Sequence, residues 1–175
     1  MNVKLRHDCK LQAYHLAVLA AFVLSACTIA HSQDTCPWMN EATASDLLGA
    51  DVNGAVAGGP ADSLSCTFTG RTGQGERTLQ ITVGVASDAH AEYLISLKRS
   101  CHSAKQNLNA IGNEAVTCPI LHRKLVMGER AVGRVRNEVF FISIGTSIQN
   151  DPILTPAMLA MKIDAATEQV AGNLF

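Results

Sequence analysis

The stretch Leu24-Ser25-Ala26-Cys27 places a thiol directly after two small residues, at the end of an apolar run that follows three basic residues. This pattern is typical of a bacterial lipoprotein signal. The thiol takes a diacylglyceryl group, the small residues let a peptidase reach the bond, and the leucine fills the third position upstream. We therefore predict that residues 1–26 are removed and that Cys27 becomes the lipidated first residue.

A membrane-spanning helix is a poor alternative for this segment. Its uninterrupted apolar core, Leu16 to Leu24, is much shorter than the roughly 20 residues that a span requires. An ordinary secretory signal cleaved near Ala30-His31-Ser32 is the remaining alternative, and it would release a soluble protein. If Cys27 is acylated, several acyl chains anchor the protein firmly, because a single chain gives only marginal attachment. We expect the cell envelope, with the domain facing the periplasm.

Size and charge limit what the rest of the chain can be. The 175 residues are 47% hydrophobic and 17% charged, which favours one domain with a substantial core. The signal removes three of 14 basic and one of 15 acidic residues, so the mature chain carries a net charge of −3. This mildly acidic chain lacks the basic surface of a nucleic-acid-binding protein. We expect a tether over residues 27–35, which holds Cys27, and a single domain over 36–175.

Four cysteines remain once Cys9 in the signal and Cys27 are set aside. An even number in an oxidising compartment indicates disulfides, with three possible connectivities. We favour Cys36–Cys66 and Cys101–Cys118, because near neighbours in the sequence close without threading. No two of these cysteines have the spacing of a zinc or haem site, so we expect no metal and no cofactor.

Catalytic signatures are weak. The chain has no Gly-x-Ser-x-Gly motif or similar local pattern. The histidines beyond the signal, none of which pairs with another at helical spacing, are His31, His90, His102 and His122. Acidic residues that would have to converge in space are Glu92, Glu114, Glu129 and Asp164. We therefore do not predict an enzyme.

A basic group is the strongest candidate for binding. Arg130, Arg134 and Arg136 share parity, so a strand would place them on one face. Such a ridge would suit an anionic envelope polymer or an acidic envelope protein. The alternative is a solvated strand edge that resists aggregation.

Patterning predicts the elements that position these residues. We expect a short helix from Asn40 to Gly49, a hairpin of 63–69 with 78–85, and a helix from Asp88 to about Ser103. A second hairpin joins 130–136 to 139–146, whose second strand is apolar on both faces and so central. Thr155-Pro156 starts a last helix that ends near Gly172. Residues 54–60 are expected to form a Gly-rich loop, and 107–118 to be mostly irregular.

The order helix, two strands, helix, two strands, helix predicts an α+β fold, with an antiparallel sheet of four to five strands and helices packed on it. Several features also resemble a known group. They are the lipoprotein signal, Cys36-Pro37, Cys66 in the first strand, Ile111-Gly112-Asn113-Glu114-Ala115 as a G-x-G-x-E-A-like turn, Arg134-Val135-Arg136 and the ending Glu168-Gln169-Val170-Ala171. Together they resemble small bacterial envelope lipoproteins of unknown function. The resemblance implies a PsbP-like α/β sandwich and contributes no catalytic residue.

These observations favour a monomeric, membrane-tethered binding or interaction module. A periplasmic small-molecule carrier or sensor is the alternative, and it would require an enclosed apolar pocket between the sheet and a helix.

Overall fold

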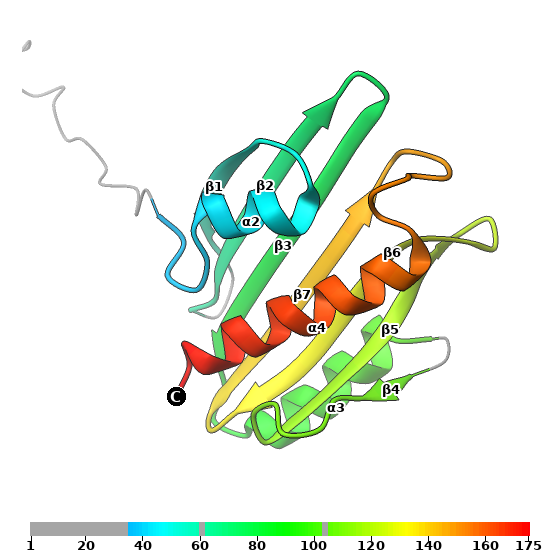
Figure 1. The fold of residues 1–175 in the computed structure, drawn as a ribbon. Helices are drawn as coiled ribbons and strands as arrows, with labels where there is room; N and C mark the ends of the chain where they lie inside the picture. Colours follow the sequence, from blue (N-terminus) through cyan, green and yellow to red (C-terminus); the bar gives the residue numbers. More distant parts are fainter. Residues whose placement is uncertain (1–34, 60–61, 103–104) are drawn as a thin grey trace, which may run out of the picture. The chain divides into compact units, whose positions relative to one another are not determined.

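The computed structural model describes residues 35–59, 62–102 and 105–175. These residues form an antiparallel sheet in the order β1-β2-β3-β7-β6-β5-β4, with helices on both of its faces (Figure 1). The elements in chain order are α2 (Glu41–Leu48), β1 (Val52–Gly58), β2 (Leu64–Thr72), β3 (Gly75–Val85), α3 (Ala89–Ser100), β4 (Gln106–Asn107), β5 (Glu114–His122), β6 (Leu125–Val135), β7 (Glu138–Thr146) and α4 (Pro156–Gly172). The predicted α+β class is confirmed, but the sheet has seven strands instead of four or five.

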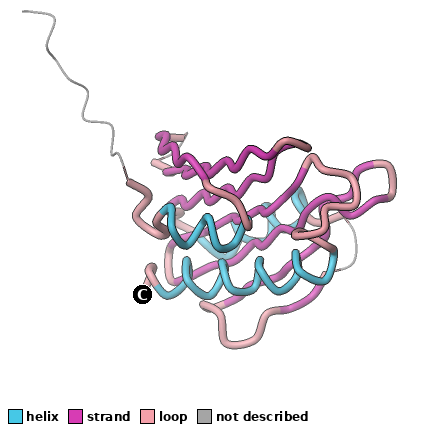
Figure 2. The backbone as a smooth tube through the Cα atoms, turned by 45° about the horizontal axis from the view of Figure 1, so that its top comes forward, coloured by secondary structure: helices cyan, strands magenta, loops and turns pink. Residues whose placement is uncertain are grey.

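Two helices share one face of the sheet and the third lies on the other. Helices α2 and α4 run beside each other over the first face, as both views show (Figures 1 and 2). They cover the larger hydrophobic core, which includes Leu79, Ile142 and Ile163. Helix α3 packs against β6 and β7 on the second face and covers a smaller core around Tyr93 and Val132. None of the described helices is long and apolar enough to cross a membrane.

The three described helices begin where the sequence predicted, and the caps predicted at Asp88 and Thr155 are confirmed. The side chains of Asn40, Asp88 and Thr155 each accept a hydrogen bond from a backbone N–H in the first turn of the following helix. Gly49 ends α2 in the left-handed conformation (φ 59°), which glycine adopts without steric cost. The second helix ends at Ser100, three residues before the predicted boundary.

The expected Gly-rich loop at 54–60 is wrong for most of its length, because residues 52–58 form strand β1. Its seven residues pair in unbroken antiparallel register with β2, from Val52 opposite Gly70 to Gly58 opposite Leu64. Valine is its only β-branched residue type, so the strand has little intrinsic propensity. The ladder with β2 supplies the order that the local sequence lacks.

The region expected to be irregular also contains strands. β5 runs for nine residues and pairs with β6, and the short β4 adds to its outer side. Its alternation is obscured because Ala115, Val116, Thr117 and Cys118 are all buried. The strand is covered by helices on both faces, so it shows no period-two pattern.

Both predicted hairpins exist with longer strands, and the turn of the first is tighter than predicted. β2 and β3 extend to Thr72 and Gly75, and β6 begins at Leu125. β7 lies fourth of seven, so its predicted central position is confirmed.

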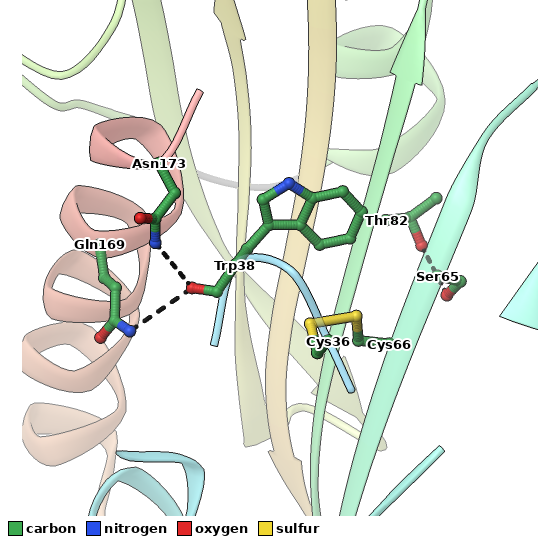
Figure 3. Close-up of a disulfide and its surroundings, with 7 residues drawn as sticks. All are labelled: Cys36, Trp38, Ser65, Cys66, Thr82, Gln169 and Asn173. Atoms are coloured by element: carbon green, nitrogen blue, oxygen red, sulfur yellow. Dashed lines mark hydrogen bonds between the residues drawn. A yellow bond between two sulfur atoms is a disulfide. The ribbon is translucent and has the colours of Figure 1, made fainter. Parts of the chain in front are cut away.

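The two predicted disulfides are confirmed. Cys36–Cys66 fastens the chain that precedes α2 to β2, and Cys101–Cys118 fastens the end of α3 to β5. Figure 3 shows the first of these together with Trp38, whose carbonyl accepts hydrogen bonds from the side chains of Gln169 and Asn173 near the end of α4. The chain therefore enters the domain held by both a covalent bond and α4.

A buried ion pair connects the ends of several elements. Arg77 on β3 and Asp151 in the loop after β7 form two parallel hydrogen bonds of 2.8 Å, and both side chains are almost completely buried. The remaining guanidinium nitrogen donates to the carbonyls of Leu48 and Gly49 at the end of α2. Burial would raise the pKa of Asp151, but hydrogen bonds from Arg77, Thr146 and the N–H groups of Ile153 and Leu154 outweigh it and hold the pKa at about 2.

We predict that Arg77→Met lowers the free energy of unfolding by about 3–5 kcal/mol, because it leaves the Asp151 carboxylate buried without its cation. Arg71→Met is the matched control on the same hairpin. Arg71 forms a 3.6 Å pair with Glu76 at the surface, so its loss should change stability by less than about 1 kcal/mol. Urea unfolding at neutral pH measures both. Equal losses for the two variants would contradict the assigned role of Arg77.

Candidate functional site

Two of the three predicted binding arginines lie on one strand and contact other parts of the domain. Arg130 donates a 2.9 Å hydrogen bond to the carbonyl of Ser100 at the end of α3. Arg134 donates to the Glu114 carboxylate at 2.8 Å and to the carbonyl of Arg136 at 3.3 Å. Both side chains face α3, on the same face of the sheet as Val132. They therefore bind α3 and β5 to β6 in addition to any contact with a partner.

Arg136 does not continue this ridge. Strand β6 ends at Val135, and Arg136 lies in the turn to β7 with a positive φ of 53°. Its guanidinium lies 5.8 Å from the ring centroid of Phe175, beyond the end of α4. The predicted alignment of all three arginines on one strand face is wrong, because the turn takes the chain out of the strand before the third residue.

His90 and Glu114 meet although the sequence gives no sign of it. His90 Nδ1 lies 3.0 Å from the Glu114 Oε1 atom that also accepts from Arg134. The hydrogen bond from Arg134 lowers the pKa of Glu114, and the bond from His90 adds to this in opposition to the effect of burial. Burial and the charge of Glu114 raise the pKa of Tyr93 on the next turn of α3. No local motif joins residues that are 24 positions apart, so only the β5–α3 packing reveals the group.

His90, Glu114 and Arg134 include the imidazole and carboxylate of a catalytic dyad, but their hydrogen bonds connect elements of the fold. The hydrogen bonds of His90 and Arg134 described above join residues of α3, β5, β6 and the turn that follows β6. In the part of the chain described above, no three His, Cys, Asp or Glu residues are arranged to hold a metal ion. The arrangement holds α3 on the sheet.

Glu129 is a buried carboxyl on the opposite face, beneath α4. Its side chain is about nine-tenths buried, and Asp164 on α4 lies close enough to interact electrostatically. Burial and the Asp164 charge raise the pKa of Glu129 to about 6. Burial and the charge of Glu168 also raise the pKa of Asp164.

A pocket of about 330 Å³ opens at the β1 edge of the sheet. Its apolar lining comes from Cys36, Met39, Val56 and Phe68. Glu41, in the first turn of α2, reaches across to accept a 2.8 Å hydrogen bond from the N–H of Gly54. Nothing in the sequence pattern indicates this pocket, because the strand beside it is predicted to be a loop.

No family model, no curated protein and no solved structure matches this chain. The resemblance to envelope lipoproteins with a PsbP-like domain therefore stays a prediction. Cys27 and the rest of the predicted signal lie outside the described residues.

We predict that Glu129→Gln changes the pH dependence of stability. The carboxyl has a higher pKa in the folded chain than its ordinary value of 4.5, so the folded state holds this proton more tightly. Wild-type stability should therefore fall as the pH rises through the range from about 4.5 to 6, by roughly 2 kcal/mol. The variant should lack this decrease. Parallel stability–pH curves from urea unfolding would show that Glu129 does not titrate in this way.

Proposed function

We propose that this protein is a membrane-tethered envelope lipoprotein whose domain acts as a binding module. The observation that carries the proposal is the pairing of all four cysteines from Cys36 onward into two disulfides. Stable disulfides are typical of an oxidising compartment, which agrees with the lipoprotein signal. Cys27 is then available for acylation.

The packing of the domain favours binding at its surface over enclosure of a small ligand. The space between the sheet and α4 is filled by side chains with no exposed area, such as Phe140, Leu159 and Ile163. Gly133 lies directly under the Phe140 ring, which would collide with a Cβ at that position. This dense core gives the carrier or sensor alternative no specific support.

The polar groups also favour binding over catalysis. Arg77 with Asp151, and His90 with Glu114 and Arg134, each connect separate elements of the fold. A hydrolase would need a nucleophile within hydrogen-bond distance of a base, and His90 is instead bonded to the carboxylate that orients it.

Cys27→Ser should move the protein from the membrane to the soluble fraction without unfolding the domain, because it removes the acyl attachment and leaves both disulfides intact. Fractionation of cells that express the full chain measures the distribution. Retention of both disulfides and an unchanged melting temperature serve as controls. A variant that stays with the membrane would rule out Cys27 as the anchor.

A further inference from the structure

Strand β1 is an edge strand whose own sequence lacks the usual protection against pairing, and the Glu41 carboxylate covers its outward N–H at Gly54. It lies at one end of the sheet order, opposite the short β4. Its sequence, Val-Asn-Gly-Ala-Val-Ala-Gly, contains no charged residue and no proline. Charged side chains, prolines and bulges are the common devices that keep an edge from pairing with another chain, and the β1–β2 register is unbroken.

The outward N–H groups of β1 can be assigned. The Gly54 N–H bonds to Glu41 and so points away from β2, whereas the Gly59 N–H bonds to Ser63 on the β2 side. N–H directions alternate along a strand that has only one neighbour. The N–H groups of Val52 and Val56 therefore point outward with that of Gly54. An added strand would pair with the N–H groups of Val52 and Val56, whereas the N–H of Gly54 already donates to Glu41.

The pocket lies directly beside this edge. Gly54 and Val56 line its strand side, and the ring of Phe68 on β2 is reached past Gly54. A Cβ at Gly54 would lie 3.1 Å from both Phe68 Cε1 and Glu41 Oε1, so the glycine leaves room beside this buried ring. A side chain from an added strand could enter here and contact Met39 and Phe68.

The charged residues that flank β1 are acidic, and the nearby Arg71 on β2 is paired with Glu76. Asp51 precedes β1, Asp62 follows it and Glu41 contacts it. The opposite edge of the sheet begins with Lys105 beside β4. An acidic edge favours a segment with basic residues by charge complementarity.

We propose that β1 binds an extended segment of a partner polypeptide as an added antiparallel or parallel strand, with a large apolar side chain in the pocket and basic residues beside it. Main-chain hydrogen bonds would give affinity and the pocket would give specificity. A second copy of this chain fits less well. The β1 side chains on the pocket face are Val52, Gly54, Val56 and Gly58, none of which is large enough to fill about 330 Å³. The inference deepens the proposed function by assigning the class of partner.

A displayed library of unstructured peptides about ten residues long, close to the upper length of a strand, provides the probe. The full chain, expressed with its own N-terminal segment, is purified from whichever cell fraction contains it and used for selection. We expect enriched peptides to combine alternating large apolar residues with Lys or Arg. The test does not depend on acylation, so failure of the lipid anchor and failure of this proposal are distinguishable.

Val56→Pro tests the edge directly. Proline removes the outward N–H of Val56 and leaves the bonds from β1 to β2 in place, which edge strands tolerate. We expect the variant to raise the Kd of the best synthesised peptide by about tenfold or more. Ala57→Thr is the control, because the N–H of Ala57 points towards β2 and its side chain lies on the face opposite the pocket, so its Kd should stay within about twofold of wild type.

Two further measurements cover a Val56→Pro variant that fails to fold. Glu41→Gln should weaken the binding of a peptide that contains Lys or Arg, and it should reduce the salt dependence of that peptide's Kd. Hydrogen exchange should show that bound peptide slows exchange at Val52 and Val56. Absence of any selected binder, or peptides that leave exchange at β1 unchanged, would overturn the proposal. Sedimentation that shows a dimer disrupted by Val56→Pro would overturn it in favour of a second copy.

Discussion

The fold depends on the buried pair of Arg77 and Asp151. One guanidinium fixes the end of α2 through two carbonyls and the loop before α4 through a carboxylate, while its own strand lies between them. The helices on the first face therefore have defined positions on the sheet. A buried pair of this kind is costly to desolvate, so its value lies in the single arrangement that satisfies all its donors and acceptors. In the folded chain the Asp151 carboxylate takes up its proton only near pH 2, whereas its ordinary pKa is 3.8. The stability that the pair contributes is therefore lost as the pH falls from about 4 to about 2.

The two edges of the sheet differ in where the nearest disulfide lies and in what covers the outer strand. At one, the Cys101–Cys118 disulfide fastens α3 to β5, and β4 adds two residues outside it. At the other, Cys36–Cys66 fastens the entering chain to β2, one strand in from the edge. This leaves the outer side of β1 beside a pocket. The Cys36–Cys66 disulfide therefore stabilises the strand next to β1 without blocking the outward N–H groups of Val52 and Val56, and this arrangement suits a binding surface.

Sequence reasoning predicted the features that have local causes. The helix starts near Asn40, Asp88 and Thr155, both disulfides and the central position of β7 follow from residue types and spacing, and they are confirmed. β1 and β5 could not be predicted in this way, since one is too rich in Gly and Ala and the other is buried on both faces. The same limit applies to the candidate sites. The contact of His90 with Glu114 and the pocket beside Gly54 arise from packing between residues far apart in the sequence. Arg136 does not lie on the same strand face as Arg130 and Arg134, because β6 ends before it in a turn that residue spacing alone does not predict.

Site-specific photo-crosslinking in the native envelope tests the central claim, a tethered module that binds a polypeptide along β1. A photoreactive residue is placed at Asn53 on β1, or at Gln80 on the interior strand β3, since both side chains are exposed on the same face of the sheet. Mass spectrometry then identifies the adducts. We predict a discrete polypeptide adduct from position 53 and none from position 80. Equal adducts from both positions, or none from position 53, would contradict the account.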